Sequence, residues 1–127
     1  MGWRAHRYAP APGSLLCPVN SVDDGACKEL RFGDGDGMLS LLVHRRGVEI
    51  RAYVNSCPHF SLPLNARPDA FLLMPGARIM CAWHCAVFGL ENGLCLEGPA
   101  RGMSLESVPV KVRDDGIFVA DPLSESS

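Results

Sequence analysis

The chain has 127 residues, a formal net charge of −2 and 47% hydrophobic residues, which is the composition of a single globular domain. The nearly balanced charge excludes the basic surface expected of a protein that binds nucleic acid or an anionic membrane. No apolar run approaches the length of a membrane span, and the first residues lack the apolar core of a secretory signal. We therefore expect no membrane insertion, and we expect a cytoplasmic location in which the six cysteines stay reduced.

The first residues show no hydrophobic periodicity. Residues 1–16 are rich in Ala, Pro and Gly and predict a loose N-terminal arm. We expect one folded domain over residues 17–121, followed by a polar tail at 122–127. Within the domain, a short strand is predicted at 26–32, and the alternating Gly and Asp residues of 33–37 are typical of a hairpin turn rather than a calcium loop.

A hairpin is predicted next. Apolar residues alternate with other residues over 39–43 and again over 48–54, and the two runs are joined by a turn at 45–47. Alternation with period two indicates a pair of antiparallel strands with one buried face. The second strand runs directly into residues 55–57.

The second half of the chain contains two more hairpin signals. An Asn-Gly dipeptide at 92–93 separates the strand-like runs 86–90 and 94–97, and Asn-Gly is the strongest short-range signal for a hairpin. The alternating run 108–112 and the run 117–119 are joined by a turn that contains two Asp and a Gly. No amphipathic helix of ten or more residues is present, so the predicted fold class is all-β.

Two short motifs carry the candidate chemistry. Cys57 and His59 form a Cys-x-His box, Cys81 and His84 form a Cys-x-x-His box, and residues 60–80 lie between the boxes. With 6 Cys and 4 His in the chain, each pattern has a chance expectation of only about 0.2. Cysteines are the usual ligands of iron–sulfur clusters, and in one class two histidines replace two cysteines on one iron. Zinc also accepts two Cys and two His, but zinc sites favour pairs of cysteines, so a Cys-x-His box suits zinc poorly.

The run NSCPHFSLPL…IMCAWHCAVFGLENGLCLEGP…VPVKVRDDGIFV resembles a Rieske-type [2Fe–2S] ferredoxin, and the resemblance extends over residues 26–120. It implies a Rieske-like antiparallel sandwich or barrel, with a small cluster-binding subdomain at one end formed by loops within about 55–100. One [2Fe–2S] cluster is the implied cofactor. The resemblance implies that the cysteines of the two boxes hold one iron and the histidines hold the other. It also implies that a loop at Gly98-Pro99 covers the cluster from a third side.

The resemblance implies a soluble electron carrier. Such a ferredoxin passes single electrons from a flavoprotein reductase to an oxygenase or another oxidoreductase, and it makes or breaks no bond in a substrate. One alternative is the small subunit of a larger oxidoreductase, such as a nitrite-reductase-like complex. Another is a zinc-stabilised binding module. We expect an electron-transfer component and not a catalytic subunit.

The chain departs from high-potential relatives at four positions. Leu62 and Trp83 stand where those relatives have a pair of disulfide-bonded cysteines, and Ala86 and Phe88 stand where they have Ser and Tyr. Loss of the disulfide and of two hydrogen bonds predicts a potential at the low end of the Rieske range, about −150 mV. A further departure is Cys85, which occupies a position where glycine is usual.

The remaining Cys and His residues have simpler interpretations. Cys17, Cys27 and Cys95 are expected to be small buried hydrophobes, with a disulfide between the first two as a minor alternative. His44 lies on the second face of a predicted strand and is expected to have no role in the site. The boxes are further apart than is common in the family, which implies an insertion within residues 65–76.

Overall fold

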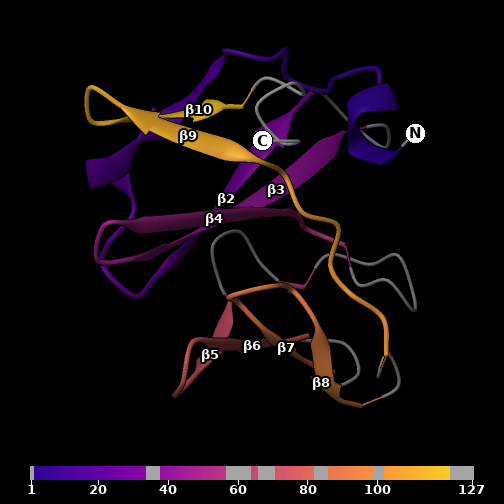
Figure 1. Ribbon diagram of the computed structural model, residues 1–127. Helices are drawn as coiled ribbons and strands as arrows, with labels where there is room; N and C mark the ends of the chain where they lie inside the picture. Colours follow the sequence, from indigo (N-terminus) through magenta and orange to yellow (C-terminus); the bar gives the residue numbers. More distant parts are fainter. Residues whose placement is uncertain are drawn as a thin grey trace.

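The computed structural model describes residues 2–33, 38–56, 64–65, 71–81, 86–98 and 102–120. Within these residues the chain forms ten strands in three antiparallel sheets, together with two 3-10 helices (Figure 1). The elements are η1 (Gly2–Ala5), β1 (Leu15–Pro18), η2 (Val19–Ser21), β2 (Cys27–Phe32), β3 (Leu39–Arg46), β4 (Glu49–Val54), β5 (Leu72–Met74), β6 (Arg78–Met80), β7 (Val87–Gly89), β8 (Cys95–Glu97), β9 (Val110–Arg113) and β10 (Gly116–Val119). The predicted all-β fold class is confirmed.

The three sheets are stacked as layers. The sheet β1-β10-β9 packs on one face of the sheet β2-β3-β4, and the four-stranded sheet β5-β6-β7-β8 covers the other face (Figure 1). We call the last sheet, with the segments that join and follow its strands, the small subdomain. The first two sheets form the sandwich that carries it.

Two hydrophobic cores fill the spaces between these layers. The upper core lies within the sandwich and consists of Trp3, Cys17, Val22, Leu39, Leu41, Val43, Ile50, Ala52, Val108, Ile117 and Val119. The lower core lies between the sandwich and the small subdomain and consists of Leu42, Tyr53, Leu64, Ile79, Cys81, Ala86, Phe88, Leu90, Cys95 and Leu105. Burial of apolar surface in the lower core is what holds the small subdomain to the sandwich.

The hairpin of β3 and β4 forms as predicted, in continuous register from Leu41 opposite Val54 to Arg46 opposite Glu49. The expectation of one buried face is wrong, however, because β3 is buried on both faces. Leu39, Leu41 and Val43 enter the upper core, whereas Leu42 enters the lower core. The small subdomain covers the face that a two-layer fold would leave exposed to water.

The other two predicted hairpins are confirmed. β7 pairs with β8 and β9 pairs with β10, both antiparallel. In the first hairpin Gly93 has φ of 77°, and a Cβ atom there would lie 2.9 Å from the Tyr53 ring. Glycine is therefore required both by the left-handed backbone and by the close approach of the ring. The hairpin is locked against the sandwich at this contact.

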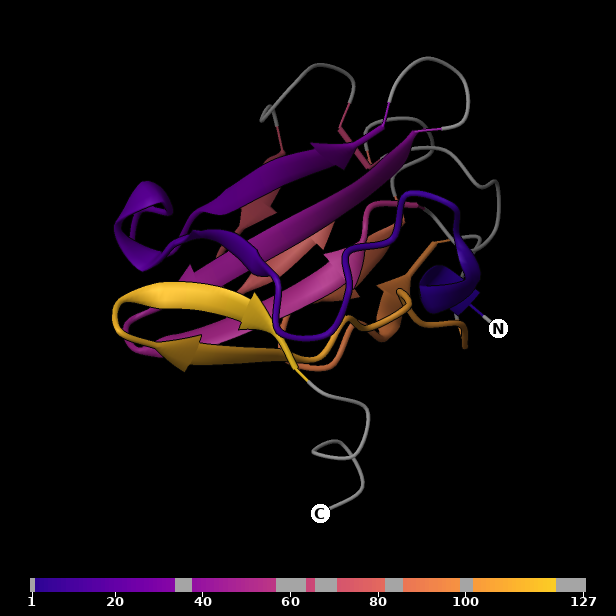
Figure 2. The ribbon, with the colours of Figure 1, turned by 90° about the horizontal axis from the view of Figure 1, so that it is seen from above.

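The loose N-terminal arm expected over residues 1–16 is wrong. Trp3 is buried in the upper core, and its backbone N–H donates to Glu106 Oε2 at 2.7 Å. Further along, the N–H of Gly13 donates to the carbonyl of Val119 at 2.8 Å. Figure 2 shows this segment running over the sandwich, with η1 at the end opposite the β9–β10 turn. A single large aromatic side chain buries enough area to fix a segment that has no periodic pattern.

Cys17 and Cys27 are both thiols, so the alternative disulfide between them does not form. Burial raises the pKa of the Cys27 thiol to about 12, so this thiol stays protonated and unreactive at neutral pH. Cys17 and Cys95 are buried, as expected for small hydrophobes. In the part of the chain that the structure describes, no helix is long and apolar enough to cross a membrane.

Candidate functional site

Of the four predicted ligands, the structure describes Cys81. This residue follows β6, is 1% exposed and belongs to the lower core. Cys57, His59 and His84 lie outside the described residues, as do Leu62, Trp83, Cys85 and Pro99. What the structure defines is the set of residues at which the three candidate loops begin and end.

The first loop, residues 57–63, is closed by a side chain. The carboxamide of Asn55 accepts a hydrogen bond through Oδ1 from the backbone N–H of Leu64 at 2.9 Å. The backbone N–H of Asn55 donates to the carbonyl of Ser40 at 2.8 Å, which ties the start of the loop to β3. Both ends of the loop are therefore fixed to the same point on the sandwich.

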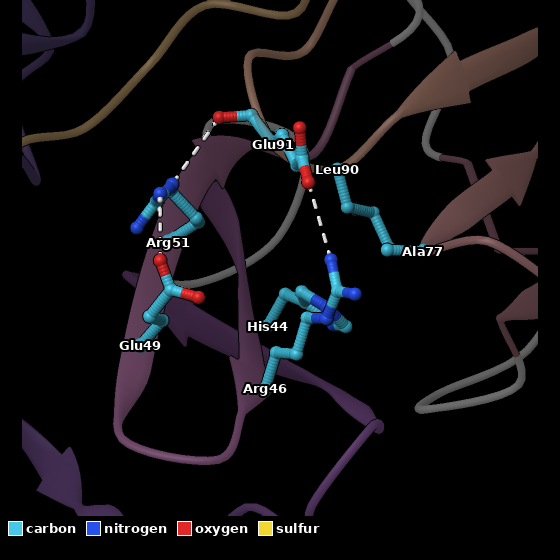
Figure 3. A pocket seen from close by; sticks show the side chains of 7 residues that line it. All are labelled: His44, Arg46, Glu49, Arg51, Ala77, Leu90 and Glu91. Carbon is cyan, nitrogen blue, oxygen red and sulfur yellow. Dashed lines mark hydrogen bonds and ion pairs between the residues drawn. The ribbon is translucent and has the colours of Figure 1, made fainter.

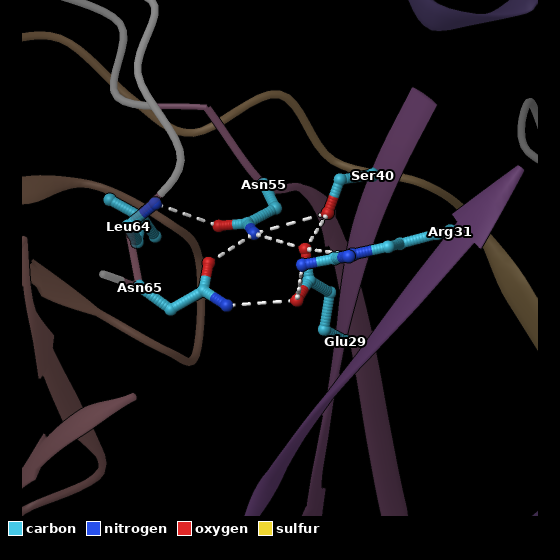
Figure 4. A network of polar contacts seen from close by, with 6 residues as sticks. All are labelled: Glu29, Arg31, Ser40, Asn55, Leu64 and Asn65. Carbon is cyan, nitrogen blue, oxygen red and sulfur yellow. Dashed lines mark hydrogen bonds and ion pairs between the residues drawn. The ribbon is translucent and has the colours of Figure 1, made fainter. Parts of the chain in front are cut away.

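A buried polar network surrounds this closure (Figure 4). Asn55 Nδ2 donates to Asn65 Oδ1 at 2.7 Å and to Ser40 Oγ at 3.1 Å. Asn65 Nδ2 donates to Glu29 Oε1 at 2.9 Å, and Ser40 Oγ donates to Glu29 Oε2 at 2.7 Å. Arg31 completes the network from the solvent side, with Nε 3.2 Å from Glu29 Oε2. The network joins β2, β3, the end of β4 and the end of the first loop.

The Glu29 side chain is only 4% exposed, yet the geometry around it stabilises the ionised form. Burial by itself raises the pKa of this carboxyl group, but hydrogen bonds from Ser40, Arg31 and Asn65 and the positive charge of Arg31 outweigh burial. The pKa therefore lies below its ordinary value. The centre of the network is a carboxylate at neutral pH.

The second loop, residues 82–85, is closed by the backbone. The N–H of Cys81 donates to the carbonyl of Ala86 at 2.7 Å, which extends the antiparallel pairing of β6 and β7 by one step. Ala86 and Phe88 are fully buried in the lower core. Neither side chain carries a hydroxyl group, so neither can donate the hydrogen bond that Ser and Tyr would supply.

The third loop, residues 99–101, is also closed by the backbone. Gly98 has φ of 99°, a value that favours glycine, and it leads out of β8. Beyond the loop, the carbonyl of Met103 accepts a hydrogen bond from the N–H of Cys95 at 2.8 Å, and Ser104 forms a β-bridge with Leu94. The chain thus returns alongside the strand that it left.

The three loop closures converge on the lower core. Leu64 from the first closure, Cys81 and Ala86 from the second, and Cys95 from the third pack in this one hydrophobic cluster. Because packed side chains fix the distances between their backbones, the three loops leave from a single rigid base. Segments far apart in the sequence, one of which bears the predicted ligand Cys81, are thereby brought together.

The far side of the small subdomain is held by a second set of contacts. The Tyr53 hydroxyl donates to the carbonyl of Leu90 at 2.8 Å, and this bond is buried. Arg46 and Arg51 reach the adjacent Glu91 at the surface (Figure 3), through its carboxylate and its carbonyl respectively. The exposed ion pair contributes little stability, so the buried Tyr53 bond is the stronger connection.

His44 is buried beside these contacts, where it lines a small pocket with both arginines (Figure 3). Its Nδ1 atom lies 3.2 Å from the carbonyl oxygen of Ala26, and Nε2 has no partner among the described residues. Burial lowers the pKa of the imidazole, and the charges of Arg46 and Arg51 lower it further, so His44 is neutral at neutral pH. None of the loop-closure contacts involves His44.

The available donors fit an iron–sulfur cluster. Thiolate sulfur from cysteine and neutral imidazole nitrogen are the donors of a two-Cys, two-His [2Fe–2S] centre. Cys81 stands in a dry, apolar environment at the root of its loop, which suits a metal-bound thiolate. Among the described residues no group of three or more His, Cys, Asp or Glu could hold a metal ion. The described remainder of the chain therefore offers no rival metal centre.

The fold and the site define an all-β domain in which three loops leave from one hydrophobic core, and known proteins with a similar fold agree with this description. A ferredoxin of carbazole 1,9a-dioxygenase from Nocardioides aromaticivorans IC177 has a similar structure, with a TM-score of 0.68 and 22% identity over 87% of this chain and 98% of that one. A Sphingomonas yanoikuyae B1 ferredoxin matches with a TM-score of 0.64 and 24% identity over 87% and 99%. A chain in the reduced complex between oxygenase and ferredoxin in carbazole 1,9a-dioxygenase matches with a TM-score of 0.72 and 17% identity, over 89% of this chain but only 30% of that one. The curated proteins gave no match.

The family model described as the Rieske [2Fe-2S] domain matches residues 14–112. The match covers most of the chain, and the chain belongs to the Rieske [2Fe–2S] domain family. Its cofactor is one [2Fe–2S] cluster. The predicted family, fold and cofactor are confirmed.

The polar network was not predicted from the sequence. Asn55 and Asn65 flank the first loop, one two residues before it begins at 57 and the other two residues after it ends at 63. Polar residues in a loop are ordinarily interpreted as solvent-exposed, and the partner Glu29 is far away in the sequence. The only signal in the chain was the paired asparagines themselves.

Proposed function

We propose that Cys57 and Cys81 hold one iron of the [2Fe–2S] cluster, that His59 and His84 hold the other, and that the chain carries single electrons. The observation that carries the proposal is the convergence of the loop closures on the lower core. That convergence sets the loops bearing the two boxes on one base.

When bound, the cluster supplies a centre that accepts and releases one electron. The residues of the chain hold that centre in place and control its surroundings. The lower core excludes water from beneath the site, and the proposed ligand Cys81 is buried in it. Neutral imidazoles at His59 and His84 donate less negative charge than thiolates, which eases the addition of an electron. Buried Ala86 and Phe88 offer no hydrogen bond to offset the added charge, so the potential stays low.

We further propose that the chain receives electrons from a flavoprotein reductase and delivers them to an oxygenase in the cytoplasm. Similar structures are described as ferredoxins of dioxygenase systems, and one matching chain comes from an oxygenase–ferredoxin complex. The thiols of Cys17 and Cys27 are consistent with a reducing compartment. A partner interface of this kind is brief and small.

The test is anaerobic purification followed by metal analysis and EPR of the dithionite-reduced protein. Two irons per chain and a rhombic signal with an average g value below that of the free electron support the proposed cluster. Stoichiometric zinc without a signal would instead favour the zinc-stabilised binding module. For the partner proposal, the reduced protein is mixed with a Rieske oxygenase under anaerobic conditions, and oxidation that follows addition of the oxygenase supports delivery of electrons.

A further inference from the structure

We propose that Asn55 is a positioning residue, which holds the two ends of the first loop together and thereby fixes the spacing of Cys57 and His59. The side chain of Asn55 bonds the main chain at Leu64, beyond the loop (Figure 4). The inference rests on the proposed function for the identity of the two ligands. It assigns a role to a residue that binds no iron.

A side chain joins the ends of this loop, and among the described residues no main-chain bond does so. β4 belongs to the sheet β2-β3-β4 of the sandwich and β5 belongs to the small subdomain, so the chain crosses between sheets from residue 55 to residue 71. The loops at 82–85 and 99–101 return to a neighbouring segment and are closed by main-chain bonds. In the part of the chain that the structure describes, Leu64 and Asn65 form no main-chain hydrogen bond, and the carboxamide of Asn55 provides the acceptor for the Leu64 N–H.

Burial of this polar network costs more free energy than apolar packing would, which indicates that it has a specific role. Asn55 is 3% exposed and Asn65 is 5% exposed, and both are bonded to a buried carboxylate at Glu29. Burying such groups costs free energy unless every one is hydrogen-bonded, and apolar residues of the same size would pack more cheaply. In the part of the chain described, His44 Nε2 is the only buried side-chain nitrogen or oxygen left without a partner, so the network is fully satisfied. A satisfied buried network fixes one geometry, which is what a ligand loop requires.

The anchor for Asn55 is rigid. Its backbone is bonded to the Ser40 carbonyl on β3, and its side chain touches Ser40 Oγ, Glu29 and Asn65. β3 is the central strand of its sheet and is buried on both faces. Motion of the carboxamide would therefore break several bonds at once.

The closure also sets the first loop relative to the second. Leu64, whose N–H is held by Asn55, is fully buried in the lower core, where Cys81 is packed as well. Because Leu64 and Cys81 pack in the same core, the position of the end of the first loop is fixed relative to the start of the second loop. Asn55 therefore influences the geometry of all four proposed ligands through contacts that involve neither iron nor sulfide.

The experiment compares Asn55→Ala with the control Asn92→Ala in the cluster-loaded protein. The control removes the same kind of bond, because Asn92 Oδ1 accepts from the Leu94 N–H at 3.0 Å, but this bond is exposed and lies in the β7–β8 turn. Hydrogen exchange of the peptide over 56–66 and the EPR line widths of the reduced cluster are measured. We expect exchange in this peptide to be at least tenfold faster in Asn55→Ala, iron to be lost about 10–100-fold faster, and the EPR lines to be broader. The control leaves all three unchanged.

A second variant covers the case in which Asn55→Ala does not fold. Glu29→Gln keeps the size of the side chain and an acceptor oxygen for Asn65, but it removes the charge and replaces the second acceptor oxygen with an amide NH2, which cannot accept the bonds from Ser40, Asn55 and Arg31. We expect the same local changes as in Asn55→Ala, in smaller measure. The inference is overturned if the folded variants exchange like the wild type at 56–66, or if exchange rises equally throughout the chain with EPR lines unchanged. A wild-type protein that purifies without a [2Fe–2S] signal refutes the proposed function instead. In that case faster exchange at 56–66 shows only that the loop is closed by Asn55.

Discussion

Removal of the Tyr53 hydroxyl tests how the small subdomain is attached to the sandwich. In Tyr53→Phe the ring still packs against Gly93, but the carbonyl of Leu90 loses its buried donor. A buried acceptor left without a partner costs about 1–3 kcal/mol, and we take about 2 kcal/mol as the expected loss in the free energy of unfolding. For a domain of this length, 1 kcal/mol shifts Tm by roughly 4 °C, so we expect Tm to fall by about 8 °C.

Circular dichroism melts and urea unfolding measure the change, and an unaltered m-value would show that the folded state stays compact. The control is Tyr8→Phe, because the Tyr8 hydroxyl has no hydrogen-bond partner among the described residues, while its ring packs closely on Gly33. Hydrogen exchange should rise mainly in the peptides of β6, β7 and β8. A fall in Tm below about 2 °C, or a fall equal to that of Tyr8→Phe, would refute the reasoning that this bond fastens the small subdomain.

Three further predictions concern the proposed cluster and the polar network. A redox titration followed by visible absorbance should give a potential of about −150 mV, and a value well above zero would contradict the interpretation of Ala86 and Phe88. His84→Cys and His59→Cys should each lower the potential if a cluster assembles, because a thiolate adds negative charge; an unchanged potential would mean that the ligands are assigned wrongly. The pKa of Glu29 is lowered in the folded protein, so its stabilising effect is complete above the unfolded value near 4.5 and is lost as the pH falls through the lower folded value. Urea midpoints measured from neutral pH to acid should therefore show Glu29→Gln to be less stable than wild type at neutral pH, with the gap closing below about 4.5, and a gap independent of pH would exclude this role.

The hairpins could be predicted because their signals are local. Turn residues and alternating side chains act between neighbours in sequence, and the predicted turns lie at 45–47, 92–93 and 114–116. Burial of both faces of β3 could not be predicted in the same way, because it depends on the small subdomain folding back over the sheet. Leu42 was the available hint, since it is an apolar residue on the face assigned to solvent.

The packing of the N-terminal segment could not be predicted for a different reason. Its main anchor is the buried ring of Trp3 in the upper core, reinforced by the bond to Glu106. Periodicity detects repeated contacts along a regular element, so it cannot detect a single anchor in an irregular segment. The large apolar surface of a tryptophan was the only sign that this segment packs.

The ligand boxes could be predicted from the sequence and the polar network around the first loop could not, for a related reason. The boxes could be found because ligand chemistry restricts residue type and spacing within a few positions. The polar network that supports the first box could not be found in this way, because Glu29, Ser40 and Asn65 come close to Asn55 only once the sheet has folded. Ligands can therefore be predicted from a single sequence, whereas the residues that orient them can be identified only from tertiary contacts.

The three closures also respond differently to mutation. At Cys81 and Ala86 the bond is made by the main chain, so no substitution other than proline at Cys81 removes the donor or the acceptor. At Asn55 the side chain makes the bond, so one substitution opens the loop without altering a proposed ligand. Asn55 is therefore the position at which the rigidity of the first loop can be changed separately from the chemistry of the cluster. Variation there should change how firmly the cluster is held before it changes the stability of the sandwich, because the sandwich core is made by other residues.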